Sequence, residues 1–390
     1  MKILFRKLRK SFILAAELVK ALSYGPTGDF LGLWRWVNQS VHEMARLRSD
    51  PPRRLLVIYD LTTQPFSMGD ILVIQEASLV VREQYQLGQI DFVLLYDPAQ
   101  PACADPAFAS IDSENILYHV ASVLPAAQVN PHHGSLFAFN SPAQLLQFIA
   151  DNVTRYHIWP SVRRFRARDY NYLHVFNDLL HNHYLKHGSL PRLTCRPFLV
   201  DWAHEFYRDH VFPAIPVTVQ IRKNKIICPS RNLQIEYWLD FFRQCETDYP
   251  VRFVIIGSRA EVDNRLRACS NVVVAKDQGT TVEQDLALIQ TAAIHMGASS
   301  GPAMLAVFNP KPYLIVNTNA HTSGHIDFVP SGPGMWKFRF ATPYQRCAEP
   351  PETKELLVKE FARMWSAVDQ AEWKSEPGRQ PKKSLVSWLR

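Results

Sequence analysis

Short apolar runs alternate with stretches of helical spacing along most of the chain. In the first half, residues 54–59 and 92–96 form nearly continuous apolar runs, the pattern of strands that are buried on both faces. Helical spacing from about residue 69 to residue 86 separates them, which predicts a β–α–β unit with parallel strands. Two further helices are predicted at residues 142–156 and 170–187.

From Pro216 onward the alternation of strands and helices becomes regular. The pattern predicts strands at residues 217–221, 251–256, 271–275, 293–296 and 313–316, and helices at residues 233–245, 260–269, 282–293 and 302–308. This order and these short connections are typical of a doubly wound domain. A final helix is predicted within residues 352–373, where apolar residues recur at helical spacing.

The sequence therefore predicts an α/β protein with two Rossmann-like domains, each built on a parallel sheet. A chain of 390 residues is long enough for two such domains. We place the domains at residues 1–195 and 196–345, with the final helix and a basic tail at 346–390. The two sheets are expected to face a cleft, the usual place for a small-molecule site.

Composition and charge narrow the class of partner. Hydrophobic residues make up 47% and charged residues 20%, as in an ordinary globular protein. A formal net charge of +7 suits anionic partners, but it falls short of the basic stripe of a nucleic-acid-binding protein, so no nucleic-acid partner is predicted. The six cysteines are scattered without a CxxC pair, which predicts reduced thiols and a cytoplasmic protein.

The N-terminal 22 residues combine basic side chains with a helical apolar face. The apolar run after Lys10 is interrupted by Glu17 and Lys20, so it is too short to span a bilayer, and it lacks the cleavage site of a signal peptide. A basic amphipathic helix can lie on an anionic membrane surface, which predicts a peripheral attachment to the inner face of the membrane. The alternative is a helix packed on its own domain with a solvated charged side.

The segment Gly297-Ala-Ser-Ser-Gly-Pro302 joins a predicted buried strand to a predicted helix. Pro302 suits the first helical position, and Ser299, Ser300 and Gly301 would place hydroxyls and free N–H groups at a helix N-terminus. Because ligands of doubly wound sheets bind at the carboxyl ends of the strands, we predict a phosphate site here. The alternative is a capped helix with a glycine for clearance.

Two charged segments follow other predicted strands. Arg222 and Lys223 come directly after the strand at 217–221, so they should emerge at the same edge of the sheet as Ser299. A guanidinium there can bind a diphosphate and offset the charge of a departing nucleotide. In the first half, Gly69 allows a tight turn and Asp70 falls in the first turn of a helix. Asp70 is either a helix cap or a general base for an acceptor hydroxyl.

Histidines offer weaker candidates. His132 and His133 precede an apolar run in a predicted loop, and they are candidates for the acceptor side of the site. His183 and His187 are spaced i, i+4 on a predicted helix, but no Glu completes an HExxH pattern. We therefore predict a polar helix face there, and no metal site.

The C-terminal half resembles the fucosyltransferase-like superfamily of GT-B glycosyltransferases. In one branch a strand ends in His-x-Arg and the Arg binds the donor diphosphate; here the segment is Gln220-Ile221-Arg222. The family's helix Asp, which helps to hold the nucleoside, is matched by Asp285, and its Ser-Ser loop by Ser299-Ser300. The catalytic Glu of that branch has no counterpart, since Ser230 and Arg231 stand near its place.

The N-terminal tetrapeptide Ser67-Met68-Gly69-Asp70 resembles the corresponding segment of bacterial heptosyltransferases (glycosyltransferase family 9), in which the Asp is the proposed base. Together the resemblances imply that residues 1–195 bind the acceptor, that residues 196–345 bind the donor, and that the last helix packs back across the hinge. We assign Asp70 and Arg222 to catalysis. We assign Arg222, Lys223, Asp285, Ser299, Ser300 and Gly301 to the donor.

The expected activity is transfer of a hexosyl or deoxyhexosyl group from a nucleoside-diphosphate sugar to the hydroxyl of a glycan, lipid-linked or other acceptor. We expect inversion, no metal and no cofactor besides the nucleotide-sugar co-substrate, for which a GDP-linked sugar is one candidate, and a role in bacterial surface glycan synthesis. Two alternatives are a nucleotide-sugar epimerase and a non-catalytic nucleotide-sugar-binding protein. An epimerase would need paired acid and base groups at one sugar carbon.

Overall fold

A computed structural model describes residues 54–99, 111–152, 154–160, 179–223, 229–318 and 328–369. The predicted N-terminal amphipathic helix, the basic tail and most of the predicted helix at 170–187 lie outside these residues. The chain forms two compact units. The first comprises Met1–Thr62, Val81–Pro101 and His132–Tyr170, and the second comprises Thr63–Val80, Ala102–Pro131 and Asn171–Arg390. Helix α3 (Met68–Tyr85) therefore contributes its first part to the second unit.

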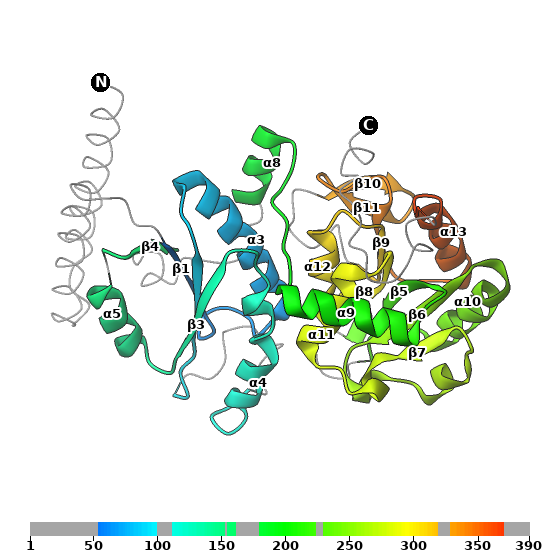
Figure 1. Cartoon of the computed structure of the whole chain (residues 1–390), viewed down its shortest axis with the longest axis horizontal. Coiled ribbons are helices and arrows are strands. Elements are labelled where there is room, and N and C mark those ends of the chain that lie inside the picture. Colours follow the sequence, from blue (N-terminus) through cyan, green and yellow to red (C-terminus); the bar gives the residue numbers. More distant parts are fainter. Residues whose placement is uncertain are drawn as a thin grey trace. The chain divides into compact units, whose positions relative to one another are not determined.

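The first unit contains a four-stranded parallel sheet in the order β3-β2-β1-β4 (Figure 1). Its strands are β1 (Arg54–Asp60), β2 (Ile90–Leu95), β3 (His133–Phe139) and β4 (Tyr156–Trp159). Helix α5 (Pro142–Asp151) packs Leu145 and Ile149 against the sheet residues Leu56, Ile58 and Val93. The predicted pair of parallel strands at 54–59 and 92–96 is confirmed.

The second unit contains an eight-stranded mixed sheet in the order β10-β11-β12-β9-β8-β5-β6-β7. The six strands from β12 to β7 are parallel, whereas β10 and β11 are antiparallel additions that the sequence pattern did not predict. The strands are β5 (Ile215–Gln220), β6 (Val251–Ile256), β7 (Val272–Val274), β8 (Ile294–Ala298), β9 (Tyr313–Val316), β10 (Phe328–Gly332), β11 (Met335–Phe338) and β12 (Gln345–Ala348).

Helices connect and cover these strands. They are α4 (Ile116–Val123), α8 (His181–His187), α9 (Pro197–His210), α10 (Ile235–Asp248), α11 (Val282–Thr291), α12 (Ala303–Val307) and α13 (Lys354–Trp365). Short 3₁₀ turns lie at Ala126–Gln128, Pro229–Arg231, Arg259–Glu261, Asn264–Ala268 and Ala275–Gln278. The parallel strands and intervening helices confirm the α/β class and the doubly wound second unit.

Residues 260–269 were predicted as one helix, and that prediction is wrong. The segment forms two 3₁₀ turns separated by Val262 and Asp263, whose backbones are extended. The Asp263 carboxylate accepts the N–H of Arg265 at 3.0 Å. A side chain that bonds its own local backbone competes with the helical pattern. The chain therefore starts a new turn at Asp263 rather than continuing the first.

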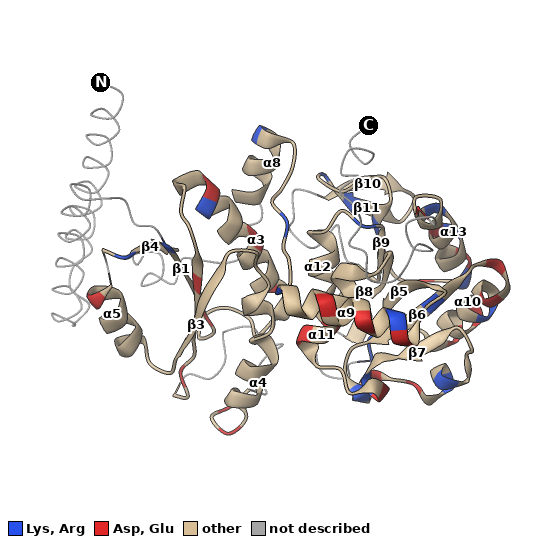
Figure 2. Cartoon of the chain, viewed as in Figure 1, with Lys and Arg blue, Asp and Glu red and all other residues tan. Residues whose placement is uncertain are grey.

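Helix α9 was not predicted, although apolar residues at 199, 202, 203 and 206 recur at helical spacing. Its charged residues are Asp201, Glu205, Arg208 and Asp209, three acidic and one basic (Figure 2). Ala203, Phe206 and Tyr207 are its buried residues, and the Tyr207 hydroxyl donates to the Leu288 carbonyl oxygen of α11 at 2.7 Å. Tertiary packing on α11 stabilises this helix.

Aromatic side chains form the main core of the second unit. In α10 the Trp238 ring contacts Phe241 and Phe242. Phe241 and Phe242 contact Phe253 of β6, and Phe241 also contacts Phe361 of α13. All five side chains are fully buried, with exposed fractions of 0%. Burial of their large apolar surfaces is the main source of stability in this core. This packing holds β6 and its neighbour β5, and the predicted site residues Arg222 and Lys223 follow the carboxyl end of β5.

The four cysteines in the described part of the chain, Cys195, Cys245, Cys269 and Cys347, are buried free thiols. Among the described helices, none has the length and apolarity needed to cross a bilayer.

Candidate functional site

The carboxyl ends of β5 and β8 form the centre of the candidate site. These strands are parallel neighbours, with Gln220 opposite Gly297. Gly297 has a φ of +154°, and a Cβ atom there would lie 2.6 Å from the Gln220 carbonyl oxygen, so only glycine allows this close approach. Arg222 and the Ser299 loop therefore emerge at the same edge of the sheet, as the sequence predicted.

Hydrogen bonds hold the loop between β8 and α12. The Ser300 hydroxyl donates to Gln220 Oε1, and the Ser299 N–H donates to the Val316 carbonyl oxygen at 3.0 Å. The expectation that Ser299 offers a free N–H is therefore wrong, because Ser299 continues the ladder between β8 and β9. Helix α12 has only five residues, so its dipole is weaker than the sequence pattern suggested.

The start of helix α3 lies against this loop. A Cβ atom on Gly301 would be 2.9 Å from the Gly69 nitrogen, and one on Gly69 would be 3.1 Å from the Gly301 Cα. Both distances are shorter than side-chain contacts normally allow, so the two glycine backbones touch. The contact places the N-terminus of an 18-residue helix beside the Ser300–Gly301 peptide. The positive end of a long helix dipole thus adds to the field at the loop.

Asp70 follows Gly69 in the first turn of α3, and it is half-buried. The Asp70 N–H donates to the Ser67 hydroxyl at 3.3 Å, and the Ile71 N–H donates to the Ser67 carbonyl oxygen at 3.2 Å. Ser67 is therefore the residue that caps the helix. The Ser67 side chain, rather than that of Asp70, accepts this N–H group of the first turn.

Arg222 and Lys223 follow β5 at the edge of the sheet. Arg222 is 8% exposed, and its carbonyl oxygen accepts the Leu233 N–H at 3.1 Å. Lys223 is exposed, and its N–H donates to Glu261 Oε1 at 3.3 Å. Backbone hydrogen bonds thus hold both residues, through the carbonyl oxygen of Arg222 and the N–H of Lys223.

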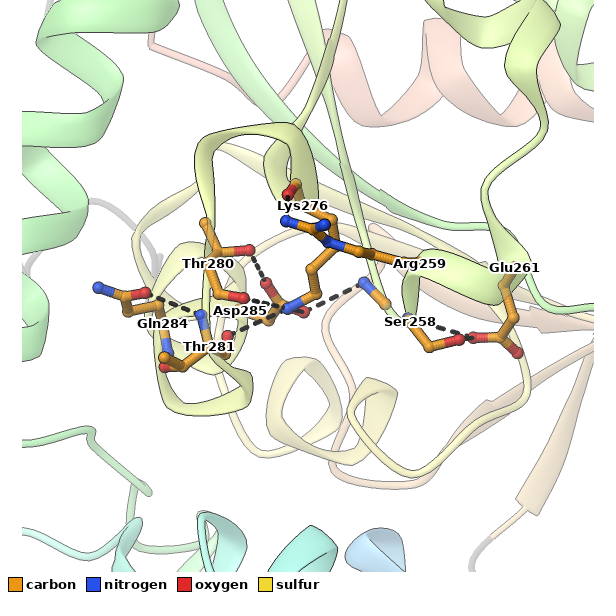
Figure 3. Close-up of polar contacts among 9 residues, drawn as sticks. Ser258, Arg259, Glu261, Lys276, Thr280, Thr281, Gln284 and Asp285 are labelled. Atoms are coloured by element: carbon orange, nitrogen blue, oxygen red, sulfur yellow. Dashed lines mark hydrogen bonds and ion pairs between the residues drawn. The ribbon is translucent and has the colours of Figure 1, made fainter.

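Asp285 lies in a hydrogen-bond network at the carboxyl end of β6 (Figure 3). Its Oδ2 is 2.9 Å from Lys276 Nζ and accepts the Gly257 N–H at 3.1 Å, while its Oδ1 accepts the Thr280 hydroxyl at 2.9 Å. Burial raises the pKa of Asp285, against the opposing effects of Lys276 and the other donors. Sequence reasoning found Asp285 but missed Lys276, Thr280 and Gly257, because no local spacing connects them.

The Asp285 network continues toward Lys223. Ser258 and Glu261 form a capping box, in which the Ser258 hydroxyl donates to Glu261 Oε2 at 3.0 Å (Figure 3). The other carboxylate oxygen of Glu261 accepts the Lys223 N–H. Gly257, bonded to Asp285, directly precedes Ser258, so bonded groups link the first turn of α11 to the segment after β5.

The histidine candidates lie elsewhere. His133 begins β3, rather than lying in a loop as predicted, and the His132 carbonyl oxygen accepts the Ile90 N–H at 2.8 Å. Both residues are at the amino end of a parallel strand, the edge opposite the usual ligand edge. The His183 and His187 rings stack at 4.4 Å on α8. In the described residues, no three His, Cys, Asp or Glu side chains are grouped to hold a metal ion.

Neither a protein-family model nor a curated protein sequence matches the chain. Solved structures are similar at low identity. The heptosyltransferase II of E. coli is 11% identical, with 80% of this chain and 99% of that chain covered and a TM-score of 0.45. A family 9 glycosyl transferase from Veillonella parvula is 13% identical, with 77% and 86% covered and a TM-score of 0.45. The wall teichoic acid polymerase TagF is 10% identical, with 94% and 90% covered and a TM-score of 0.31. At these values, function has to be argued from the residues of the site.

Proposed function

We propose that the protein is a GT-B glycosyltransferase that uses a nucleoside-diphosphate sugar. The observation that carries the proposal is the contact between Gly69 and Gly301. The contact brings the helical turn that carries Asp70 to the loop after β8, and Arg222 follows β5 at the same edge of the sheet as that loop. A carboxylate, an arginine and helix N-terminal N–H groups at one sheet edge are the parts that sugar transfer from a diphosphate requires.

Arg222 and the loop would bind the diphosphate. A guanidinium can bind two phosphate oxygens at once, and its burial strengthens the interaction because less water competes. Lys223 would add a flexible point charge, since its side chain is exposed. Ser300 and Gly301 would contribute backbone N–H groups, with the field of α3 behind them.

The reaction would be a displacement at the anomeric carbon of the donor. The acceptor hydroxyl oxygen forms a bond to that carbon, and the bond from the carbon to the diphosphate oxygen breaks. Asp70 takes the hydroxyl proton, and the electron pair leaves with the nucleoside diphosphate. Arg222 offsets the negative charge that develops on the leaving group, which needs no metal ion in this scheme. A single displacement of this kind inverts the anomeric configuration.

The Asp285 network would form the nucleoside side of the site. Both of its carboxylate oxygens accept bonds from the chain, so its first effect is to fix the Gly257 turn. Gly257 has a φ of +116°, which glycine tolerates and other residues rarely adopt. Asp285 would hold the nucleoside through this turn, with its remaining lone pairs available to a ribose or base N–H or O–H group.

The donor would be a hexosyl or deoxyhexosyl nucleotide, with GDP-linked sugars one candidate, and the acceptor a glycan or lipid-linked hydroxyl in bacterial surface glycan synthesis. His132 and His133 remain candidates for the acceptor side, although their place at the amino end of β3 gives them no support. A cytoplasmic protein held peripherally at an anionic membrane remains the proposed location.

Titration calorimetry of the full-length protein with ADP, GDP and UDP, followed by mass spectrometry of donor and acceptor, tests the proposal. We expect one nucleoside diphosphate to bind best and its sugar conjugate to be hydrolysed slowly or transferred. Isomerisation of the donor without an acceptor would instead identify an epimerase. Binding without either reaction would identify a nucleotide-sugar-binding protein, and no binding would exclude all three activities.

A further inference from the structure

A backbone hydrogen bond joins Arg222 to Leu233. The Leu233 N–H donates to the Arg222 carbonyl oxygen at 3.1 Å, and the Leu233 side chain is buried in the core of the second unit. The position of the Arg222 backbone therefore depends on where Leu233 is held. Residues that fix Leu233 and its two neighbours also fix Arg222.

Asn317 and Glu352 hold the residues on either side of Leu233. The Asn317 side-chain amide donates to the Asn232 carbonyl oxygen at 3.0 Å, and Glu352 Oε1 accepts the Gln234 N–H at 2.6 Å. Asn317 is 3% exposed and Glu352 is 1% exposed, so water competes little with either bond. These contacts join segments more than eighty residues apart in the sequence.

The same two residues are bonded to each other and adjoin the loop after β8. The Glu352 N–H donates to Asn317 Oδ1 at 3.2 Å. Asn317 has a φ of +55°, a left-handed conformation that asparagine tolerates better than most residues. It directly follows Val316, whose carbonyl oxygen accepts the Ser299 N–H. Asn317 thus stands between the two segments that bind the diphosphate in the proposed function.

We propose that Asn317 and Glu352 are positioning residues for donor binding. The inference rests on the proposed function. In it, this pair fixes the position of Arg222 relative to the Ser299 loop. The pair acts through the backbone of residues 232–234 and does not itself touch the donor. A loss of either side chain would release Leu233, let the Arg222 backbone shift, and weaken the bidentate contact, which depends on orientation.

A purely structural role is the competing explanation. Gln234 is the residue before helix α10, so Glu352 also satisfies a backbone N–H at the start of that helix. Removal of the side chain then lowers stability without changing donor affinity. Glu360 provides a matched control, because it is 2% exposed, lies on α13, and pairs with Arg346 and Arg363.

The test measures the Kd of the tightest-binding of ADP, GDP and UDP for Glu352→Ala, Glu352→Gln, Asn317→Gly and Glu360→Ala, with melting temperatures alongside. Asn317→Gly removes the amide while keeping a residue that accepts the positive φ. We expect Glu352→Ala and Asn317→Gly to raise Kd about tenfold, the size of a lost hydrogen-bond contribution. Glu352→Gln should recover most of the affinity because it retains Oε1, and Glu360→Ala should lower only the melting temperature.

The same variants in an Arg222→Ala background separate the two explanations. If the pair acts through Arg222, its loss should change Kd less than about twofold in that background, because interacting residues are non-additive. Two results would overturn this inference while leaving the proposed function intact. One is an unchanged Kd in folded Glu352→Ala and Asn317→Gly, and the other is an equal loss of affinity in the wild-type and Arg222→Ala backgrounds. Absence of binding by the wild-type protein would overturn the proposed function, and this inference with it.

Discussion

Gly69 and Gly301 touch through their backbones, so that a Cβ atom on either residue would overlap the other. This contact brings the start of α3 to the loop after β8 within the second unit. It also explains why both positions are glycine without invoking an unusual φ. The site depends on the two chain segments approaching this closely.

We expect Gly301→Ala to lower the free energy of unfolding by about 1–3 kcal/mol, the cost of a forced contact in a packed region. Turnover should fall by about 10-fold or more, because the Asp70 helix is pushed away from the loop. Denaturant unfolding and steady-state kinetics provide the measurement. Gly279→Asn is the control, because nothing lies within 4 Å of that position and asparagine tolerates its φ of +76°. An Ala variant at Gly301 with wild-type kinetics would show that the contact is dispensable.

Asp70→Asn should lower kcat by roughly 10²–10⁴, the usual contribution of a positioned base, with little change in donor affinity. The substitution keeps the size of the side chain, and Ser67 continues to cap the helix. Stability should therefore change by less than about 0.5 kcal/mol, as for substitutions away from special features. Single-turnover kinetics with saturating donor measures the effect. A variant that retains full turnover would remove Asp70 from the catalytic step.

Arg222→Ala should weaken binding of the nucleoside diphosphate by about 2–3 kcal/mol, the range of a charge-assisted contact. The backbone bond from the Leu233 N–H to the carbonyl oxygen of residue 222 does not need the arginine side chain, so it should persist in the variant. Titration calorimetry measures the affinity. Arg267→Ala is the matched control, because its guanidinium is 43% exposed and pairs with Asp277 on the surface. Equal affinities of the two folded variants would contradict the role of Arg222.

His295 predicts a pH dependence of stability. It is 2% exposed on β8, and burial lowers its pKa to about 3. In the unfolded chain its pKa returns to about 6.5, so on acidification the unfolded state takes up the proton first. The stability contribution is therefore complete above pH 6.5 and declines by up to about 1.4 kcal/mol per pH unit between about 6.5 and 3.

Urea unfolding at pH 7.5, 6.0 and 5.0 checks this prediction. As the pH falls from 7.5 to 5.0, the free energy of unfolding should decrease more steeply for the wild-type protein than for His295→Gln, because glutamine cannot take up a proton. His187→Gln removes an exposed histidine and should follow the wild-type slope. Parallel slopes of the wild-type protein and His295→Gln would show that His295 is not buried neutral in solution.

The N-terminal residues Lys2, Arg6, Lys7, Arg9 and Lys10 predict attachment to anionic membranes. Liposomes containing phosphatidylserine should sediment the full chain but not a form without the first 22 residues. The difference should decrease as salt is added, because exposed charges are screened within about 8 Å at physiological ionic strength. Equal sedimentation of both forms would favour a helix that packs on its own domain.

Much of the second unit could be predicted from periodicity. The runs at 217–221, 251–256 and 313–316 became β5, β6 and β9, because buried parallel strands are apolar on both faces. The shared edge of Arg222 and Ser299 followed, since parallel strands end on one side of a sheet. Local pattern failed at residues 260–269, where Asp263 bonds its own backbone. Helix α9, which packs on α11, was also missed, although its apolar residues recur at helical spacing.

The sequence by itself thus determined which residues stand at the ends of strands and helices, because those positions depend on local spacing. Only the tertiary structure decided which of them meet. In the folded chain Gly69 lies against Gly301, and the Ser67 hydroxyl accepts an N–H group of the first turn of α3. The Ser299 N–H donates to Val316 of β9, and the Glu352 carboxylate accepts the Gln234 N–H. These are contacts between segments far apart in the chain, and their geometry depends on packing that no local pattern encodes.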